Sequence, residues 1–189
     1  LMEAGEMRED VFELFLRNVR MPASQGLDLK AQVAANTVSR GRIRETADEY
    51  GADALRTTYD EMIEYGERTA RERIDALPDG TYRHVDYLDF DALHRLECTL
   101  TVDGETMTFD FTGTADQAPS FVNCAYPCAE ANLHNAVQTV LFPEETVNAG
   151  TFAPIDLVIP EGTVFNCTPP NPCGGASIYA GWRVMSLAI

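Results

Sequence analysis

Residues 96–111 decide the fold, and they read LECTLTVDGETMTFDF. Apolar and polar residues alternate from Leu96 to Val102 and again from Met107 to Phe111, on either side of Asp103-Gly104. Alternation with a period of two is typical of half-buried strands, and Asp-Gly between two such runs favours a type I′ turn. The stretch therefore predicts a β-hairpin, and residues 82–88 upstream predict a third strand.

On the N-terminal side of this hairpin, apolar residues recur at helical spacing. The pattern predicts helices over about residues 6–18, 28–50 and 53–77. Gly26-Leu27-Asp28 is expected to be a turn between the first two helices, with Asp28 as the N-cap. A short turn at Gly51 joins the second and third helices, which predicts an antiparallel helical hairpin.

On the C-terminal side, the pattern predicts a helix over residues 126–142 and a short strand over 155–159. Residues 167–175 are rich in Pro and Gly and predict a loop before a last helix. That helix reaches Ile189 without a cap, and the chain starts at Leu1, so we expect an internal piece of a longer polypeptide with a truncated C-terminus.

Together these elements predict an α+β fold with two regions. Residues 1–80 are expected to be a helical region that includes the hairpin and serves as scaffold or subunit interface. Residues 81–189 are expected to be a β-hairpin or mixed sheet with packed helices, and this region carries the polar turns described below.

The charge of the chain restricts its partners. Thirty acidic and 14 basic residues give a net charge of −16, and Lys30 is the only lysine. An acidic surface repels phosphate backbones, which disfavours nucleic-acid binding, and it also fits a protein kept soluble at high salt. The sequence contains no apolar run of about 18 residues, so it predicts no membrane span. Five cysteines without a secretory signal indicate reduced thiols in the cytoplasm.

Glycine-punctuated polar turns between residues 110 and 150 are the strongest candidates for a site. Short hydroxyls, amides and free backbone N–H groups at the ends of rigid elements suit a pocket for a planar amide or carboxylate substrate. The same residue types also satisfy tight turns for their own sake, and composition alone favours this second interpretation. The catalytic candidates are Asp110, Thr112, Thr114 and Asn123, and the substrate-binding candidates are Gly113, Asn148 and Gly150.

Cysteine and histidine offer a weaker alternative. Cys124-x3-Cys128 and Cys167-x5-Cys173, with His134 between them, could supply zinc ligands, but these are not the usual zinc-knuckle spacings. Buried or loop thiols without metal are the simpler interpretation, and an inert Cys128 at a helix start is favoured over an activated thiolate. His84 and His94, which flank a predicted strand, are expected at the surface.

Motifs for two common chemistries are absent from the sequence. There is no Gly-x-Ser-x-Gly element and no Gly-x-x-x-x-Gly-Lys-Ser/Thr element. This chain therefore cannot form an ordinary P-loop, and any ATP used is expected to be bound elsewhere.

Two runs resemble the hydantoinase B/oxoprolinase family, with Asn123 between them. They are Asp110-Phe111-Thr112-Gly113-Thr114-Ala115-Asp116-Gln117 and Val147-Asn148-Ala149-Gly150-Thr151-Phe152-Ala153-Pro154-Ile155. The helical region carries further matches at residues 28–36 and 77–82, so the resemblance covers nearly the whole chain. The Ser120-Phe121-Val122 run and the cysteines depart from the usual hydantoinase pattern. A carboxylase-like member of the family therefore stays an alternative.

The resemblance implies a cytoplasmic, hetero-oligomeric enzyme in which ATP with Mg is bound by a hydantoinase A-type ATPase subunit. Such enzymes open cyclic amides such as hydantoins and oxoproline, and related large subunits carboxylate acetone and acetophenone. The family's divalent-metal ligands lie outside the matched region, so no metal ligand is carried over to this chain.

We therefore expect part of the non-ATPase catalytic subunit of an ATP-dependent cyclic-amide hydrolase, inactive as a fragment. Two alternatives are the large subunit of a ketone carboxylase and a non-catalytic assembly module. A metal-binding domain built on the cysteines is a third.

Overall fold

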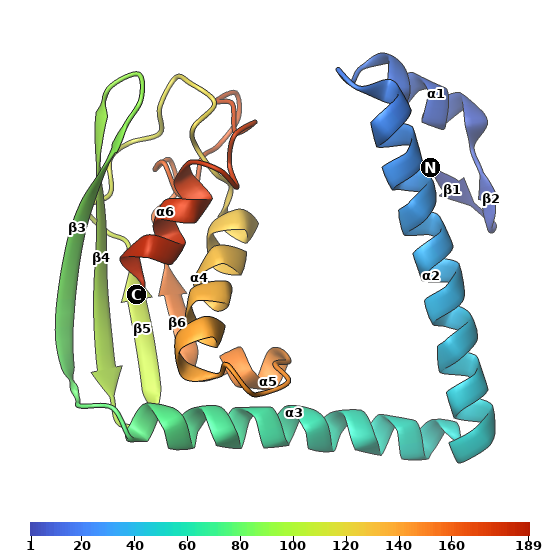
Figure 1. The fold of residues 1–189 in the computed structure, drawn as a ribbon, viewed down its shortest axis with the longest axis horizontal. Coiled ribbons are helices and arrows are strands. Elements are labelled where there is room, and N and C mark those ends of the chain that lie inside the picture. The colour runs from blue at the N-terminus through green and yellow to red at the C-terminus, as the bar shows by residue number, and fades with distance from the viewer. The chain divides into compact units, whose positions relative to one another are not determined.

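The computed structural model describes residues 1–189 and divides into two compact units, Leu1–Thr58 and Tyr59–Ile189 (Figure 1). The first unit holds a small antiparallel strand pair that the sequence did not predict, followed by helices. Its elements are β1 (Met2–Glu3), β2 (Glu6–Met7), α1 (Glu9–Arg17), α2 (Pro22–Tyr50) and the first residues of α3 (Ala52–Asp75).

Helix α2 begins earlier than expected, because the predicted turn at residues 26–28 is wrong. Pro22 occupies the first turn of the helix, where its missing N–H costs nothing. Gly26 continues the helix and lies against the side chains of Leu16 and Phe12, so this glycine permits close helix packing and not a chain reversal. The predicted stop at Gly51 is confirmed, since its φ of 90° lies in the left-handed region.

The second unit contains a mixed four-stranded sheet in the order β3-β4-β5-β6. The pairs β3–β4 and β4–β5 are antiparallel, and β5–β6 is parallel. Helices α4 and α6 contact each other, and α6 contacts β3 (Figure 1). The bounds are β3 (Gly80–Asp89), β4 (Leu93–Asp103), β5 (Thr106–Asp110), α4 (Tyr126–Leu141), α5 (Ala149–Phe152), β6 (Ile155–Val158) and α6 (Ala180–Leu187). The α+β class and the predicted third strand are confirmed.

The β4–β5 hairpin forms as predicted, but its turn differs in type. Asp103 pairs with Thr106, so the two loop residues are Gly104 and Glu105. Only Gly104 has a positive φ, of 54°. A type I′ turn needs positive φ at both central residues, so that prediction is wrong; glycine at the first position alone is the pattern of a type II′ turn.

The core of the second unit lies between the sheet and the helices. Phe111 and Phe165 are fully buried and meet edge to face, with ring centroids 5.4 Å apart. Other fully buried large side chains are Phe109, Phe142, Leu96, Leu133, Val122 and Val164. None of the helices combines the length and apolarity that crossing a lipid bilayer requires.

Helix α5 is docked on α3 by the Asn148 side chain and by close packing of Gly150 on the α3 backbone. Asn148 caps α5 by accepting a hydrogen bond from Gly150 N (2.8 Å), and its Nδ2 donates to the Met62 carbonyl oxygen of α3 (2.9 Å). Gly150 itself is buried so closely against the Ile63 carbonyl oxygen that an added Cβ would overlap it. The glycine therefore sets how near the two helices can approach.

We predict that Gly150→Ala destabilises the second unit by about 1–3 kcal/mol or more, because the clash is with backbone and cannot be relieved by a rotamer change. Urea denaturation followed by circular dichroism measures the loss. The matched control is Gly41→Ala in α2, where no atom lies within 4 Å of the added Cβ. The control is expected to gain up to about 1 kcal/mol from helix propensity. Equal stability of the two variants would contradict the role of Gly150.

Candidate functional site

The Asp110–Thr114 turn lies at the outgoing end of β5, as predicted. Asp110 Oδ1 accepts a hydrogen bond from Thr112 N at 2.8 Å, and Thr114 N donates to Phe111 O at 3.1 Å. Gly113 has a φ of 97°, a conformation that other residues rarely adopt. Thr112 and Gly113 are exposed, so the turn presents a hydroxyl and a backbone N–H to solvent beside a half-buried carboxylate.

A buried carboxylate on the neighbouring strand supports this turn. Glu97 of β4 is 6% exposed and forms ion pairs with both Arg83 of β3 and Arg95. The Arg95 Nη1 also donates to the Gly113 carbonyl oxygen at 2.7 Å. The Thr114 hydroxyl accepts from Glu97 N (3.1 Å) and donates to Glu97 O (3.2 Å). We call Arg83, Arg95, Glu97, Gly113 and Thr114 the Glu97 cluster.

The arginines fix the charge of this cluster. The hydrogen bond from Arg83, joined by one from Arg95, holds the pKa of Glu97 below its usual value against the opposing effect of burial. The same pairing raises the pKa of Arg83. A Cβ on Gly113 would lie 2.5 Å from Glu97 Oε2, so the close approach of turn and carboxylate also requires glycine there.

Sequence reasoning missed Arg83, Arg95 and Glu97. The sequence feature that could have identified them is the pair of opposite charges at Arg95 and Glu97, two residues apart in a strand of alternating apolar and polar residues. The pairing of Val85 with Glu97 then brings Arg83 beside the same carboxylate. A strand with solvent on its polar face would show the same pattern, so only the tertiary structure reveals that Glu97 is buried.

Asn123 has every side-chain polar atom engaged with backbone. Its Oδ1 accepts from Ala118 N at 2.7 Å, and its Nδ2 donates to the carbonyl oxygens of Ala118, Ser120 and Pro172 at 2.9–3.0 Å. The residue is 0% exposed. Asn123 thus fastens two loops to each other and offers no free polar atom to a ligand.

The predicted site residues therefore belong to three separate hydrogen-bond networks. Asp110, Thr112, Gly113 and Thr114 lie beside Glu97, Asn123 fastens the loops, and Asn148 with Gly150 docks α5 on α3. Of these residues, Thr112 and Gly113 are exposed and Asp110 is half-buried, whereas the amide atoms of Asn148 are hydrogen-bonded to backbone groups.

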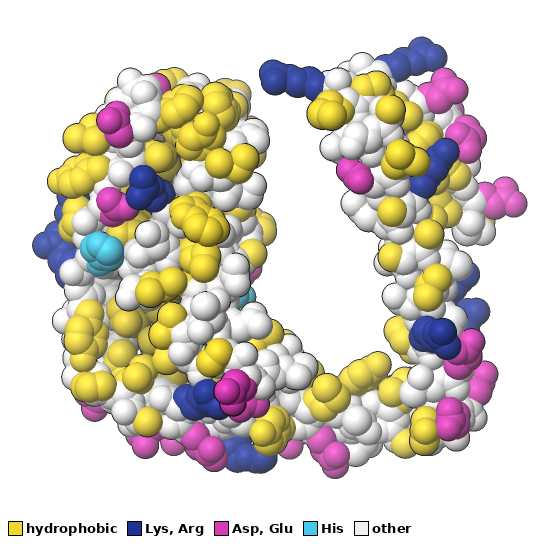
Figure 2. Space-filling model, viewed as in Figure 1, with side chains coloured by type: hydrophobic (Ala, Val, Ile, Leu, Met, Phe, Trp, Pro, Cys, Tyr) yellow, Lys and Arg dark blue, Asp and Glu magenta, His cyan; other side chains and the backbone are white.

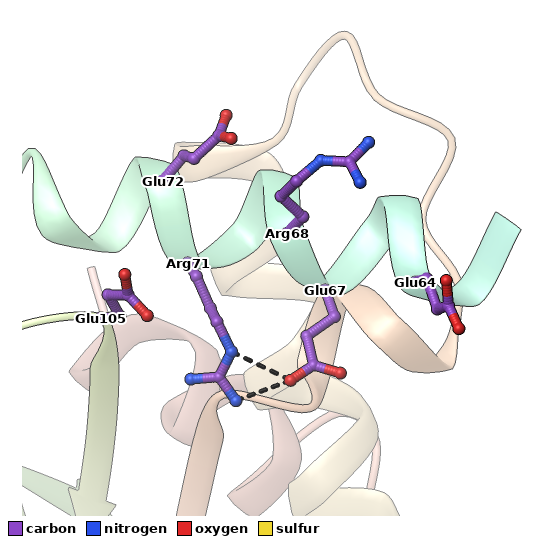
Figure 3. Close-up of a pocket in the computed structure, with 6 residues that line it drawn as sticks. All are labelled: Glu64, Glu67, Arg68, Arg71, Glu72 and Glu105. Carbon is purple, nitrogen blue, oxygen red and sulfur yellow. Dashed lines mark hydrogen bonds and ion pairs between the residues drawn. The ribbon is translucent and has the colours of Figure 1, made fainter. Parts of the chain in front are cut away.

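A strongly charged hollow of about 360 Å³ lies on α3 (Figure 3). Glu64, Glu67, Arg68, Arg71 and Glu72 of the helix line it together with Glu105 from the β4–β5 turn. Within it Arg71 donates to Glu67 through Nε (2.9 Å) and Nη2 (2.6 Å), as Figure 3 shows. Arg71 and Glu67 thus neutralise each other within the hollow.

A smaller hollow of about 150 Å³ lies where the end of α6 meets the sheet, with His84 and Cys98 in its lining. His84 is exposed, as expected. His94 is 9% exposed, so its predicted surface position is wrong. It is held by Asp91, whose Oδ1 lies 2.9 Å from His94 Nε2.

Aromatic side chains gather at the surface near the start of α6. Phe90, Phe121 and Tyr179 pack edge to face with centroids 5.2–5.6 Å apart, and Ile178 and Trp182 are exposed nearby in sequence. Figure 2 shows hydrophobic side chains over this part of the second unit. No three His, Cys, Asp or Glu side chains of the chain are arranged to hold a metal ion.

Comparison with known proteins agrees with the resemblance drawn from the sequence. The acetophenone carboxylase delta subunit of Aromatoleum aromaticum is 32% identical over 185 residues, which cover 93% of this chain and 27% of that protein. The B-type subunit of a putative D-/L-hydantoinase from a Pseudomonas species is 29% identical, over 90% of this chain and 31% of that protein. The chain thus spans about a third or less of the length of these relatives.

Solved structures share the fold. The ATP-dependent caprolactamase of Pseudomonas jessenii matches with a TM-score of 0.90 at 23% identity, over 100% of this chain and 33% of that one. The nucleotide-free acetone carboxylase structure matches with a TM-score of 0.82 at 22% identity, over 91% of this chain and 25% of that one. The model of the hydantoinase B/oxoprolinase family matches residues 1–189. The chain therefore belongs to the hydantoinase B/oxoprolinase family.

Proposed function

We propose that this chain is part of the non-ATPase subunit of an ATP-dependent hydrolase of cyclic amides, working in the cytoplasm. Family membership over residues 1–189 supports the proposal, as do relatives named as a B-type hydantoinase component and as the beta component of a caprolactamase. The observation that carries it is the Asp110–Thr114 turn, which holds an accessible carboxylate beside an exposed hydroxyl and backbone N–H.

A cyclic amide offers one N–H donor and one carbonyl acceptor on the same edge. Asp110 would accept from the substrate or from an attacking water, while Thr112 and the Gly113 N–H would donate to the carbonyl oxygen. Thr114 would act indirectly, because its hydroxyl is used by the Glu97 backbone. Asn123, Asn148 and Gly150 would brace the elements on which the turn rests.

ATP with Mg is assigned in this proposal to a hydantoinase A-type partner subunit. The residues of this chain do not fit a P-loop, and no cluster here is arranged for a metal ion. Relatives named as single subunits of larger enzymes support a hetero-oligomer.

Ketone carboxylation is the alternative chemistry, favoured by the 32% identity to the acetophenone carboxylase delta subunit. An assembly role is favoured by the exposed apolar side chains of α2, which include Leu27, Val38 and Ile43. The position of the Asp110 turn is the same under all three functions. Activity measurements are therefore needed to distinguish the hydrolase, the carboxylase and the assembly role.

The test is to co-purify the protein carrying this sequence with its ATPase partner and to measure ADP release with two substrate panels. Hydantoin, 5-oxoproline and caprolactam form the first panel, and acetone and acetophenone with bicarbonate form the second. We expect substrate-dependent ATP hydrolysis and ring-opened product with a member of the first panel. Turnover of ketones alone would replace the proposal with its alternative, and turnover of neither would leave the assembly role.

We predict that Asp110→Asn in the active complex lowers kcat/KM by about 10- to 100-fold. This corresponds to the ~1.5–3 kcal/mol that a hydrogen bond to a charged group contributes. The matched control is Asp116→Asn, another acidic residue of the same run, which should retain nearly full activity. Wild-type kcat and KM in Asp110→Asn would refute the role of this carboxylate.

We predict that Glu97→Gln weakens folding at neutral pH and that the difference from wild type shrinks in acid. The pKa of Glu97 is lower in the folded state than its usual 4.5, so its stabilisation is present above about pH 4.5 and is lost as pH falls through the folded-state pKa. Urea denaturation at pH 7 and pH 3 tests this. The exposed Glu161→Gln serves as control, and a difference that does not change with pH would contradict the ionised state.

A further inference from the structure

Four of the five free cysteines lie near one another in the second unit, because Cys128, Cys167 and Cys173 all act on the Cys124 thiol. Cys124 precedes α4 and Cys128 lies in its first turn, while Cys167 and Cys173 bound a proline-rich loop. Cys167 N donates to Cys124 O at 3.0 Å, so the start of this loop runs beside the segment leading into α4. The fifth, Cys98, is buried on β4.

Hydrogen bonds fold the proline-rich loop back on itself. Asn171 N donates to Thr168 O at 3.1 Å, which closes a turn in the middle of the loop. Gln117 Oε1 accepts from Thr168 N at 2.7 Å, and Asn123 Nδ2 donates to Pro172 O at 2.9 Å. Both ends of the loop are thus anchored to the 117–124 segment, so Cys167 and Cys173 are held as neighbours on one short loop.

Solvent access distinguishes the four thiols. Cys124 is fully buried, and burial raises the pKa of its thiol strongly, so it is a poor nucleophile. Cys128 and Cys167 are half-buried, and Cys173 is exposed. An oxidant therefore reaches Cys173 first. Burial raises the pKa of the Cys167 thiol and the Cys173 thiol raises it further, so Cys167 is the slower nucleophile and reacts second, from its anchored position beside Cys173.

We propose that Cys167 and Cys173 form an oxidisable dithiol that small-molecule disulfides such as oxidised glutathione convert into an intramolecular disulfide. The Cys173 thiolate attacks one sulfur of the small disulfide and expels the first thiolate, giving a mixed disulfide. The Cys167 thiolate then attacks Cys173 Sγ and expels the second. In sum, two protein thiols are oxidised and one small disulfide is reduced to two thiols.

A dithiol fits these four residues better than a metal site. No three of the cysteines and their acidic or histidine neighbours are arranged to bind a metal ion. The Cys124–Cys128 pair is less suited to exchange, because one member is wholly buried. The Cys167–Cys173 pair combines an exposed thiol with a neighbour on the same anchored loop.

The test exposes the reduced, folded chain to oxidised glutathione and digests it at glutamate under non-reducing conditions. Cleavage after Glu161 places Cys167 and Cys173 in the peptide that begins at Gly162 and contains residues 162–189, while Cys124 and Cys128 fall in fragment 106–130 and Cys98 in fragment 98–105. We expect fragment 162–189 to lose the mass of two hydrogens and to regain it with a reductant.

Two variants sharpen the result. Cys173→Ser should abolish the mass loss, whereas the matched control Cys98→Ser, in the buried strand, should leave it unchanged. The proposal is overturned if the disulfide joins fragments 106–130 and 162–189, or if it forms within 106–130. It is also overturned if fragment 162–189 stops at two glutathione adducts, or if the chain carries one zinc ion and no reactive thiol.

Discussion

Strand β5 is hydrogen-bonded along both edges, to β4 on one side and to β6 on the other, and this double pairing governs the second unit. A strand held on both sides cannot slip by one residue without turning its whole apolar set outward. Met107, Phe109 and the following Phe111 are thereby committed to the core, and Asp110 is committed to the opposite face. The position of the candidate carboxylate is a direct consequence of the pairing that buries its neighbours.

Local patterns were sufficient for most of the secondary structure. The alternation around Asp103-Gly104 predicted the hairpin, and helical spacing predicted α1, α3 and α4 within a few residues. Two of the errors share a cause, which is that glycine permits several conformations. Gly26 was interpreted as a turn and lies within a helix because Phe12 and Leu16 pack against it. The type of the hairpin turn depended on a one-residue shift of register that sequence alone does not determine.

The candidate site was less predictable, because its organisation depends on contacts between distant residues. The sequence identified Asp110 and Gly113, but the Glu97 cluster beneath them requires β3, β4 and the turn to be assembled first. The parallel pairing of β5 with β6 is likewise invisible locally, since the whole of α4 lies between them. Several residues of the family motifs hydrogen-bond to backbone groups. These motif residues therefore stabilise the fold, and a match to the motif does not by itself identify a catalytic residue.

Asn123 illustrates how a single atom can decide whether a residue is tolerated. Its amide nitrogen faces three carbonyl oxygens inside a fully buried site. An aspartate has nearly the same shape, but it would direct a second oxygen and a costly buried negative charge at those same acceptors. Conversion of this one amide into a carboxylate would thus turn the link between the two loops into a repulsion, so the contact between residues 118–120 and Pro172 depends on a single nitrogen atom.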